Sequence, residues 1–286
     1  MALDNFIPEI WSSQLLVNLK NELVFGNPLV ANRNYEGEVS RFGDTVRINS
    51  IGAVAVGDYT KNTNHAAPET LSDSQMVMVI DQAKMFNFQI DSVDAAQQNP
   101  KLMGAAMREA SFALANTAAG FLSALINSGT PAGNTLTAVS ADAADGSEDG
   151  NVYRAFVDLG VKLDENNAPS QGRWAVVRPS LLGVLRKDPR FASFGTEANR
   201  AVVANGLVGT VAGFNILVSN TSPLSNSNPQ ILAGHSMAVT YADQIESLVA
   251  YQPELRFADA MKGLHVYGGK VIRPELLAKV EVDVTV

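Results

Sequence analysis

One long helical pattern constrains this sequence more than any other feature. Over residues 94–128, apolar side chains recur at alternating steps of four and three residues, as they do along one face of a helix. Asn99 and Pro100 are suited to the start of such a helix, and Gly129 to its end. A helix of about 28 residues would be about 42 Å long. A compact domain of 286 residues rarely needs such a length, so the pattern predicts an elongated molecule with a helical strut.

Before this helix, between residues 36 and 91, the pattern changes to a period of two, which is typical of strands. The candidate strands are residues 44–49, 76–80 and 85–90. A polar, turn-forming stretch at residues 57–68 separates the first two. The sequence therefore predicts a long two-stranded excursion. Such an element has little core of its own, and we expect it to be better ordered when it is packed on a partner.

The N-terminal residues predict a short arm with one helix. Four apolar side chains follow one another at a spacing of four residues: Trp11, Leu15, Leu19 and Leu23. A helix at a chain terminus needs a surface against which to bury such a stripe. That surface is either the core of the same chain or a neighbouring subunit, and the pattern alone leaves both open.

The part that follows the long helix mixes helices and strands, which predicts an α+β class. After a loop at residues 130–150, the candidate elements are helices at 152–163 and 179–187 and strands at 172–177, 206–219 and 231–241. Strands are also expected near the end of the chain, at residues 248–251, 264–267, 271–273 and 280–286. Gly268 and Gly269 are expected to form a two-residue hairpin turn between two of these.

Composition excludes several classes of protein. Because there is no cysteine, the chain cannot be a disulfide scaffold, a thiol enzyme or an iron–sulfur protein. A net charge of −8 argues against tight binding to nucleic acid. Only 17% of the residues are charged, whereas about 25% are in typical soluble chains. We infer that something else covers part of the surface.

No targeting segment or membrane span is expected. The first residues lack the basic and apolar regions of a signal peptide, and no apolar run approaches about 18 residues. Synthesis in the cytoplasm is therefore expected.

The residues that usually carry catalysis do not converge. Each of the three histidines is isolated in sequence from acidic or nucleophilic partners: His65, His235 and His265. No metalloprotease, serine-hydrolase or phosphate-loop motif is present. We therefore expect no catalytic residue and no cofactor.

Two local patterns resemble binding sites only in part. Gly206, Gly209 and Gly213 do not have the spacing of a dinucleotide-binding loop, and tight turns explain them better. In the acidic stretch at residues 142–149, Asp145 could take the first position of a calcium loop, but Phe156 then stands where the bidentate glutamate is required. We expect a solvated acidic loop and no metal site.

Four sequence strings, taken in order, resemble one known family. They lie at residues 43–48 (GDTVRI), 80–91, 172–179 (GRWAVVRP) and 213–220. Together they resemble the major capsid (coat) protein of tailed bacteriophages, a fold shared with encapsulins, over nearly the whole chain. The resemblance implies an N-terminal arm at 1–36, a long β-hairpin E-loop at 37–80, a P-domain with a long spine helix at 81–129, an inserted A-domain at 130–244 and P-domain strands at 245–286.

The resemblance also implies a function. Copies of the chain would assemble into hexamers and pentamers of an icosahedral head in the virion, made in the host cytoplasm. The implied partners are other copies, a separate scaffolding protein and a portal protein, with a decoration protein left open. The packaged double-stranded DNA would be held without tight binding, and no membrane is involved. The candidate inter-subunit contacts are Trp11, Leu15, Leu19, Leu23, Tyr59 and Lys61.

Some relatives crosslink their shells through a Lys–Asn isopeptide bond between an E-loop and a neighbouring P-domain. Lys61 stands at the tip of the excursion, but no asparagine occurs after Asn228. The P-domain strands at 245–286 therefore offer no acceptor, and we predict no such crosslink. Two alternatives remain: an encapsulin-type compartment, and an α+β enzyme whose site the sequence does not reveal.

Overall fold

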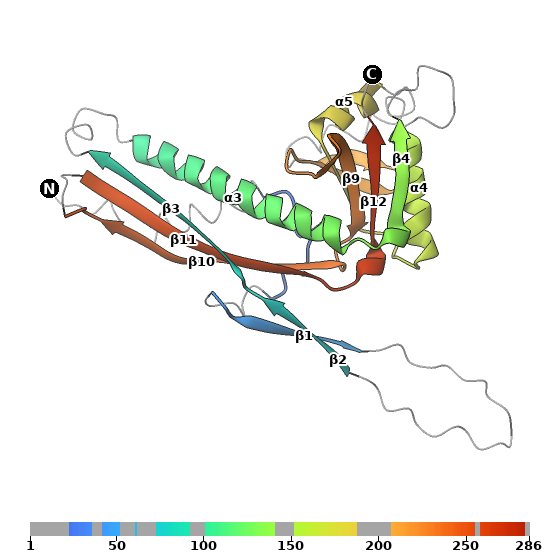
Figure 1. The fold of residues 1–286 in the computed structure, drawn as a ribbon, viewed down its shortest axis with the longest axis horizontal. Coiled ribbons are helices and arrows are strands. Elements are labelled where there is room, and N and C mark those ends of the chain that lie inside the picture. Colours follow the sequence, from blue (N-terminus) through green and yellow to red (C-terminus); the bar gives the residue numbers. More distant parts are fainter. Residues whose placement is uncertain are drawn as a thin grey trace.

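The computed structural model describes residues 23–35, 42–51, 61, 73–91, 101–140, 152–187, 207–254 and 258–283. Figure 1 shows an elongated arrangement of three parts. Helix α3 (Lys101–Gly129) lies along a three-stranded sheet, an α/β body stands at the C-terminal end of the helix, and a pair of strands projects on the other side of the sheet. The predicted strut is confirmed, while its predicted start at Asn99 and Pro100 falls outside the described residues.

Helix α3 has 29 residues and is therefore about 43 Å long. Leu114, Ala118, Leu122 and Ile126 recur at a spacing of four along its buried face. By length and composition alone, Ala105–Gly129 is apolar enough to cross a membrane, but the core helix of a soluble protein meets the same criteria. In this structure the buried face of α3 packs on protein.

The sheet beneath α3 is antiparallel, in the order β10-β11-β3. Its strands are β3 (Gln82–Asp91), β10 (Val239–Tyr251) and β11 (Ala258–Val271). The ring of Tyr267 on β11 meets Phe121 of α3 edge to face, with centroids 5.5 Å apart. Helix and sheet thus share one apolar layer.

The expected hairpin turn at Gly268 and Gly269 is wrong, because β11 runs straight through both residues. They pair with Ala242 and Tyr241 of β10. A β-carbon on Gly268 would lie 2.5 Å from the carbonyl oxygen of Val79, and one on Gly269 would lie 3.0 Å from a methyl carbon of Leu125. The two glycines therefore let other elements approach both faces of the strand. Besides forming turns, glycine serves within strands where another part of the chain must come close.

The strands β1 (Thr45–Ile51) and β2 (Asp73–Val79) pair antiparallel, which confirms the two-stranded excursion. One face of the pair joins the sheet in a small apolar cluster. The buried members of this cluster are Val46, Ile48, Met78, Ile80, Ala242 and Val266. Val77 and Val79 point the other way and are exposed, so the apolar run at 76–80 buries only alternate side chains.

The α/β body is built on a seven-stranded sheet, in the order β4-β12-β9-β5-β7-β6 with β8 beside β9. Its strands are β4 (Thr135–Ser140), β5 (Arg173–Val177), β6 (Leu207–Val211), β7 (Phe214–Val218), β8 (Leu224–Ser225), β9 (Asn228–His235) and β12 (Leu277–Asp283). Its helices are α4 (Val152–Glu165) and α5 (Pro179–Lys187), with the short η2 (Ala132–Asn134) and η5 (Pro274–Leu276). Ala212 and Gly213 have positive φ angles of 48° and 85°, so the turn predicted at Gly213 is confirmed.

The C-terminal strand differs from the expected division of the chain. The resemblance places strand β12 with the P-domain strands at 245–286, whereas in the structure it lies between β4 and β9 in the seven-stranded sheet. The expected boundary at 244 also falls inside β10. The alternation of Val280 and Val282 predicts one buried face, which is correct, but alternation cannot identify the strands on either side.

Candidate functional site

Charged and polar side chains that could do chemistry do not gather in an open site of the described structure. In the described ranges, no group of three or more histidine, cysteine, aspartate or glutamate side chains could hold a metal ion. His65 and the acidic stretch at 142–149 fall outside those ranges. His235 accepts a hydrogen bond from the backbone N–H of Met237 at 3.2 Å and has a structural role.

One buried polar cluster joins the segment at residues 23–35, here called the anchor segment, to β10. The Arg33 guanidinium donates to Asp243 Oδ1, and Tyr241 donates its hydroxyl to Oδ2 of the same carboxylate at 3.2 Å. Arg33 also donates to the carbonyl of Gly26 at 3.1 Å and lies over the Tyr241 ring, 5.4 Å from its centroid. Backbone bonds between Asn32 and β10 continue the same attachment.

Burial dominates the electrostatics of this cluster. The Asp243 side chain is 1% exposed, so its charge relies on the partners around it. Desolvation raises the pKa of Tyr241 well above its usual value, and the nearby Asp243 carboxylate adds to the shift. His265 Nε2 lies 3.5 Å from Asp243 Oδ2 and is equally buried. Although an Asp–His pair can serve in catalysis, this one has no route to a substrate, and we assign it to attachment of the anchor segment.

A second polar contact closes the C-terminal end of α3. Lys279 of β12 donates to the carbonyl of Asn127 at 2.8 Å and to its side-chain oxygen at 2.9 Å. The last turn of α3 contains no basic residue of its own, so Lys279 supplies the cation that a helix C-terminus favours. Burial lowers the pKa of Lys279.

Neither polar contact was expected from the sequence. Arg33 and Asp243 are 210 positions apart, and Asn127 and Lys279 are 152 apart. No local spacing signals such pairs. The scarcity of charged residues is the one available signal, because a rare charge beside apolar residues is often a paired one.

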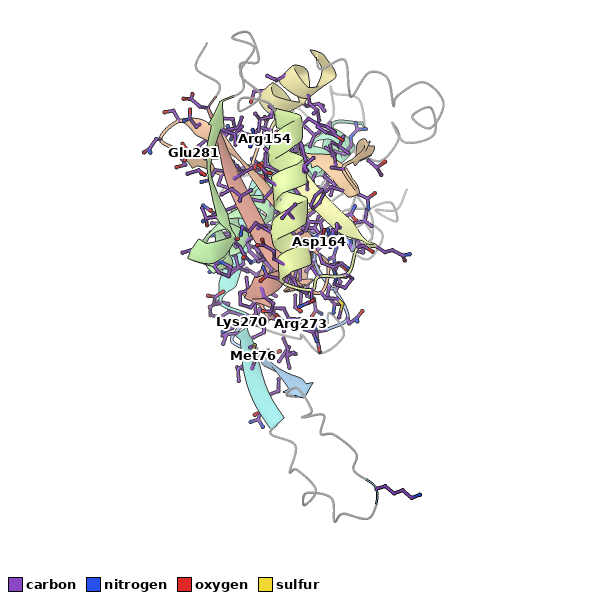
Figure 2. All side chains as sticks on the ribbon, turned by 90° about the vertical axis from the view of Figure 1, so that its right-hand side faces the viewer. Met76, Arg154, Asp164, Lys270, Arg273 and Glu281 are labelled. Carbon is purple, nitrogen blue, oxygen red and sulfur yellow. The ribbon has the colours of Figure 1, made fainter. Side chains whose placement is uncertain are left out.

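Exposed apolar side chains are the more informative surface feature. They occur on the outward face of the β1–β2 pair, on β3, where Met85 is 80% exposed, and on α4, where Val157 and Val161 stand one turn apart. Figure 2 shows the separation between α4, which carries Arg154 and Asp164, and the strand pair that carries Met76. Single exposed apolar side chains are ordinary, whereas those grouped on one face mark contacts with other molecules. The informative groups are therefore Val77 with Val79 and Val157 with Val161.

The predicted contact residues are only partly described. Trp11, Leu15, Leu19 and Tyr59 lie outside the described residues, and Lys61 is exposed. Leu23 is 2% exposed and belongs to the main core with Phe25. For this last member of the N-terminal stripe, the surface that buries it is the same chain.

The family of the chain follows from its similarity to known proteins. Residues 73–280 match the family described as phage capsid protein. The chain belongs to this family. No curated protein sequence matches it.

Solved structures agree with the family. A structure from Mycobacterium phage Che8 is 27% identical to this capsid protein, with a TM-score of 0.68 over 90% of each chain. The capsid structure of cyanophage P-SCSP1u is 18% identical, with a TM-score of 0.66 over 86% of this chain and 85% of that one. A virus-like particle from Pyrococcus furiosus is 14% identical, with a TM-score of 0.54 over 96% of this chain and 98% of that one. The last two show the fold alone.

These findings confirm the resemblance to the major capsid protein of tailed phages and the α+β fold expected from it. The capsid protein is a structural protein of the virion shell. Its functional surfaces are therefore those through which copies of the chain meet.

Proposed function

We propose that this capsid protein assembles into hexamers and pentamers, which tile an icosahedral head around double-stranded DNA. The β1–β2 pair carries the proposal. Its inward face holds only a small apolar cluster, and its outward face exposes Val77 and Val79 by 40% and 47%. A two-stranded element with so little core is marginal in water, so a neighbouring copy that covers the outward face would stabilise it.

A projecting element also suits a closed ring. When one copy extends a strand pair onto a different patch of the next copy, the contact is heterologous, and such contacts form rings when the rotation from copy to copy closes. Each contact can be modest because many of them act together. The low charge of 17% supports this arrangement, since charges buried between subunits would lose their hydration.

The proposal includes a domain assignment. We assign residues 37–80 to the E-loop, α3 to the spine of the P-domain, and residues 130–238, which end before β10, to the A-domain. The C-terminal assignment is changed so that β12 belongs with the A-domain sheet, while β10 and β11 remain under the spine.

The remaining parts of the proposal concern partners. A net charge of −8 suits a container whose wall does not hold DNA tightly. A separate scaffolding protein and a portal protein would direct assembly, and a decoration protein is a further candidate. We propose no catalytic role, because the described polar clusters are buried and paired.

Negative-stain electron microscopy of the protein expressed alone and with its neighbouring phage genes tests the proposal. Closed shells of uniform size are expected. The variant Val77→Asp/Val79→Asp should fold, as judged by circular dichroism, but should give at most about a tenth of the wild-type particles, because it places charge in the proposed contact.

The matched control is Val77→Thr/Val79→Thr, which keeps a β-branched shape without a charge. It should assemble to within about twofold of wild type. Shells that form equally well with the aspartate variant would remove the β1–β2 pair from the proposed contact. A small monomer at every concentration would overturn shell assembly.

The second candidate is the encapsulin-type compartment for a protein cargo that the sequence resemblance also implies; the Pyrococcus furiosus virus-like particle shares the fold alone. Particle contents separate the two. Nuclease-protected DNA in purified particles supports the head, and a single co-purified enzyme supports the compartment.

A further inference from the structure

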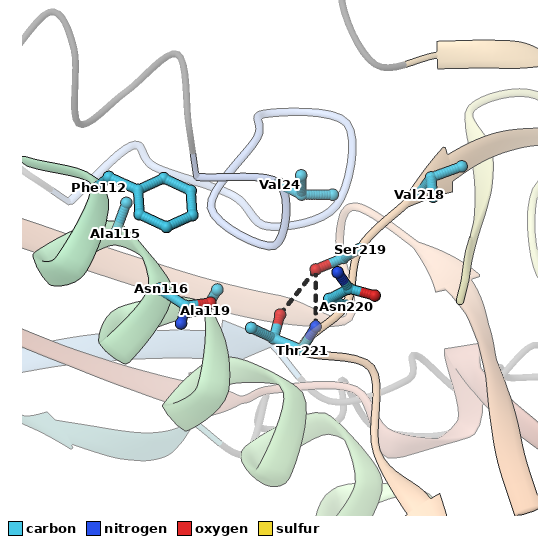
Figure 3. A pocket seen from close by; sticks show the side chains of 9 residues that line it. All are labelled: Val24, Phe112, Ala115, Asn116, Ala119, Val218, Ser219, Asn220 and Thr221. Carbon is cyan, nitrogen blue, oxygen red and sulfur yellow. Dashed lines mark hydrogen bonds between the residues drawn. The ribbon is translucent and has the colours of Figure 1, made fainter. Parts of the chain in front are cut away.

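A groove runs between α3, the anchor segment and the loop after β7. Its volume is about 190 Å³, and its lining includes Val24, Phe112, Asn116, Ala119 and Thr221. Figure 3 shows the Phe112 ring at one end of this groove and Val24 above the helix. On the loop side, the Ser219 hydroxyl accepts a hydrogen bond from the backbone N–H of Thr221 and shares another with the Thr221 hydroxyl. Arg178 donates to the carbonyl of Ser222. This space is called the α3 groove below.

The chemistry of the α3 groove favours an apolar occupant. The Phe112 side chain is 50% exposed, although a phenyl ring gains most from burial. Residues 110–129 of α3 include no charged side chain, whereas a solvent-facing helix surface normally carries several. A cavity of about 150 Å³ can hold benzene, so the α3 groove has room for one aromatic side chain.

The place where the described chain begins indicates which segment reaches this groove. It begins at Leu23, and Val24 itself lines the groove. Leu23, the fourth member of the apolar stripe, is already buried in the core beside it. Leu19 stands five residues before Val24, a helical rise of about 7.5 Å. The segment of residues 1–22 is therefore joined to the chain at the rim of the α3 groove.

We propose that residues 1–22 of the same chain occupy the α3 groove, with the side of the predicted helix that carries Trp11, Leu15 and Leu19 turned into it. The short tether favours the groove of the same chain over that of a neighbour, because a short link gives an effective concentration in the millimolar range. The groove would bury the stripe, and the stripe would cover Phe112. The inference does not depend on shell assembly.

Disulfide trapping tests this proposal, since the chain contains no cysteine. Asn116→Cys is combined with Leu15→Cys in one variant and with Leu19→Cys in another. A disulfide needs α-carbons within about 7 Å. Mild oxidation should join at least half of the chains internally in one of the two variants, seen as a shifted monomer on a non-reducing gel and as a linked peptide by mass spectrometry.

The matched control pairs Leu19→Cys with Val161→Cys on the exposed face of α4, where Val161 is 49% exposed. It should form an internal disulfide at least ten times more slowly. Covalent dimers and ladders in place of the shifted monomer would overturn the proposal in favour of a neighbour's groove. Free thiols in both test variants would overturn it as well.

Electron microscopy of the same samples separates the two proposals. Normal shells without an internal disulfide would contradict the docking of residues 1–22 in the α3 groove and support shell assembly. An internal disulfide in a chain that never forms shells would support the docking and contradict shell assembly.

Discussion

At the scale of single residues, Asp243 is the one carboxylate that is buried among the described residues. Asp243 is almost completely enclosed, and Arg33 and Tyr241 satisfy both of its oxygens. Such a pair adds little to stability compared with apolar residues of similar size, but removing one partner leaves an uncompensated charge. The Arg33–Asp243 pair therefore serves mainly to hold the anchor segment in place on β10.

Arg33→Met tests this attachment. The variant should lower the free energy of unfolding by about 3 kcal/mol, because the Asp243 charge would lose its guanidinium partner. The double variant Arg33→Met/Asp243→Asn should recover part of the loss, since it removes the stranded charge. Denaturant unfolding of the unassembled subunit measures both. A loss below about 1 kcal/mol in the single variant would mean that water or other groups replace the pair.

Tyr241 makes a prediction about alkaline pH. Burial raises its pKa, so the folded state keeps the proton after the unfolded chain has lost it. The resulting stabilisation is complete below about pH 10, the ordinary tyrosine pKa, and is lost as the pH rises toward the folded value. Tyr241→Phe should cost about 1 kcal/mol at pH 7, for the lost hydrogen bond to Asp243.

The pH dependence supplies the second half of this test. Between about pH 10 and 11.5, stability should fall less steeply in Tyr241→Phe than in wild type. Some decline remains expected, because burial also raises the pKa of Tyr267. Equal slopes in the two proteins would contradict the assignment to Tyr241.

At the scale of elements, β11 serves as the shared support of two layers. On one face of β11, Tyr267 packs on α3. On the other face, Val266 belongs to the small apolar cluster shared with β1 and β2. Gly268 lies against the backbone of Val79 and Ile80, where β2 ends. The position of the β1–β2 pair thus depends on a missing side chain.

Gly268→Ala should therefore lower stability by about 1–3 kcal/mol, because the new methyl group meets a carbonyl oxygen and backbone that cannot easily move. Gly120→Ala is the matched control. It lies in α3 with no atom within 4 Å of the new β-carbon and should raise stability by up to about 1 kcal/mol. Thermal unfolding compares the two. An unchanged melting temperature for Gly268→Ala would show that the strand pair can shift at no cost.

The sequence predicts those elements whose signal is local. The apolar periodicity of α3, the amphipathic face of α4 and the alternation in β1 can be seen within a few turns or strand residues, and the structure contains all three. Glycine pairs are ambiguous by comparison, because tight turns and close contacts both require a missing side chain. Only the tertiary neighbours of Gly268 decide between them.

At the scale of the whole molecule, partner choice within a sheet is the least predictable property. Strand β12 pairs with β4, more than a hundred residues earlier, and with β9. Arg33 and Asp243 are joined over a similar distance. Such pairings depend on the complete fold and leave no trace in local spacing, whereas the overall elongation could be inferred from one helix.

The absence of a covalent shell crosslink is a prediction at this same scale. Lys61 is exposed, but the chain after Asn228 offers no asparagine. The capsid protein of boiled virions should therefore run as a single band near the 30.4 kDa of one chain on a denaturing gel. A ladder of multiples that disappears in Lys61→Arg, which preserves the charge, would contradict the prediction.

The place of β12 has a consequence for synthesis on the ribosome. The strand sits between β4 and β9, so β4 stays separated from the rest of the sheet until residues 277–283 emerge. Folding of this body must then wait until β12 has been made, more than a hundred residues after β4, although N-terminal parts usually fold first during translation. A product that ends before residue 277 would expose unpaired strand edges. Such a product should be removed by proteolysis before it can enter a shell.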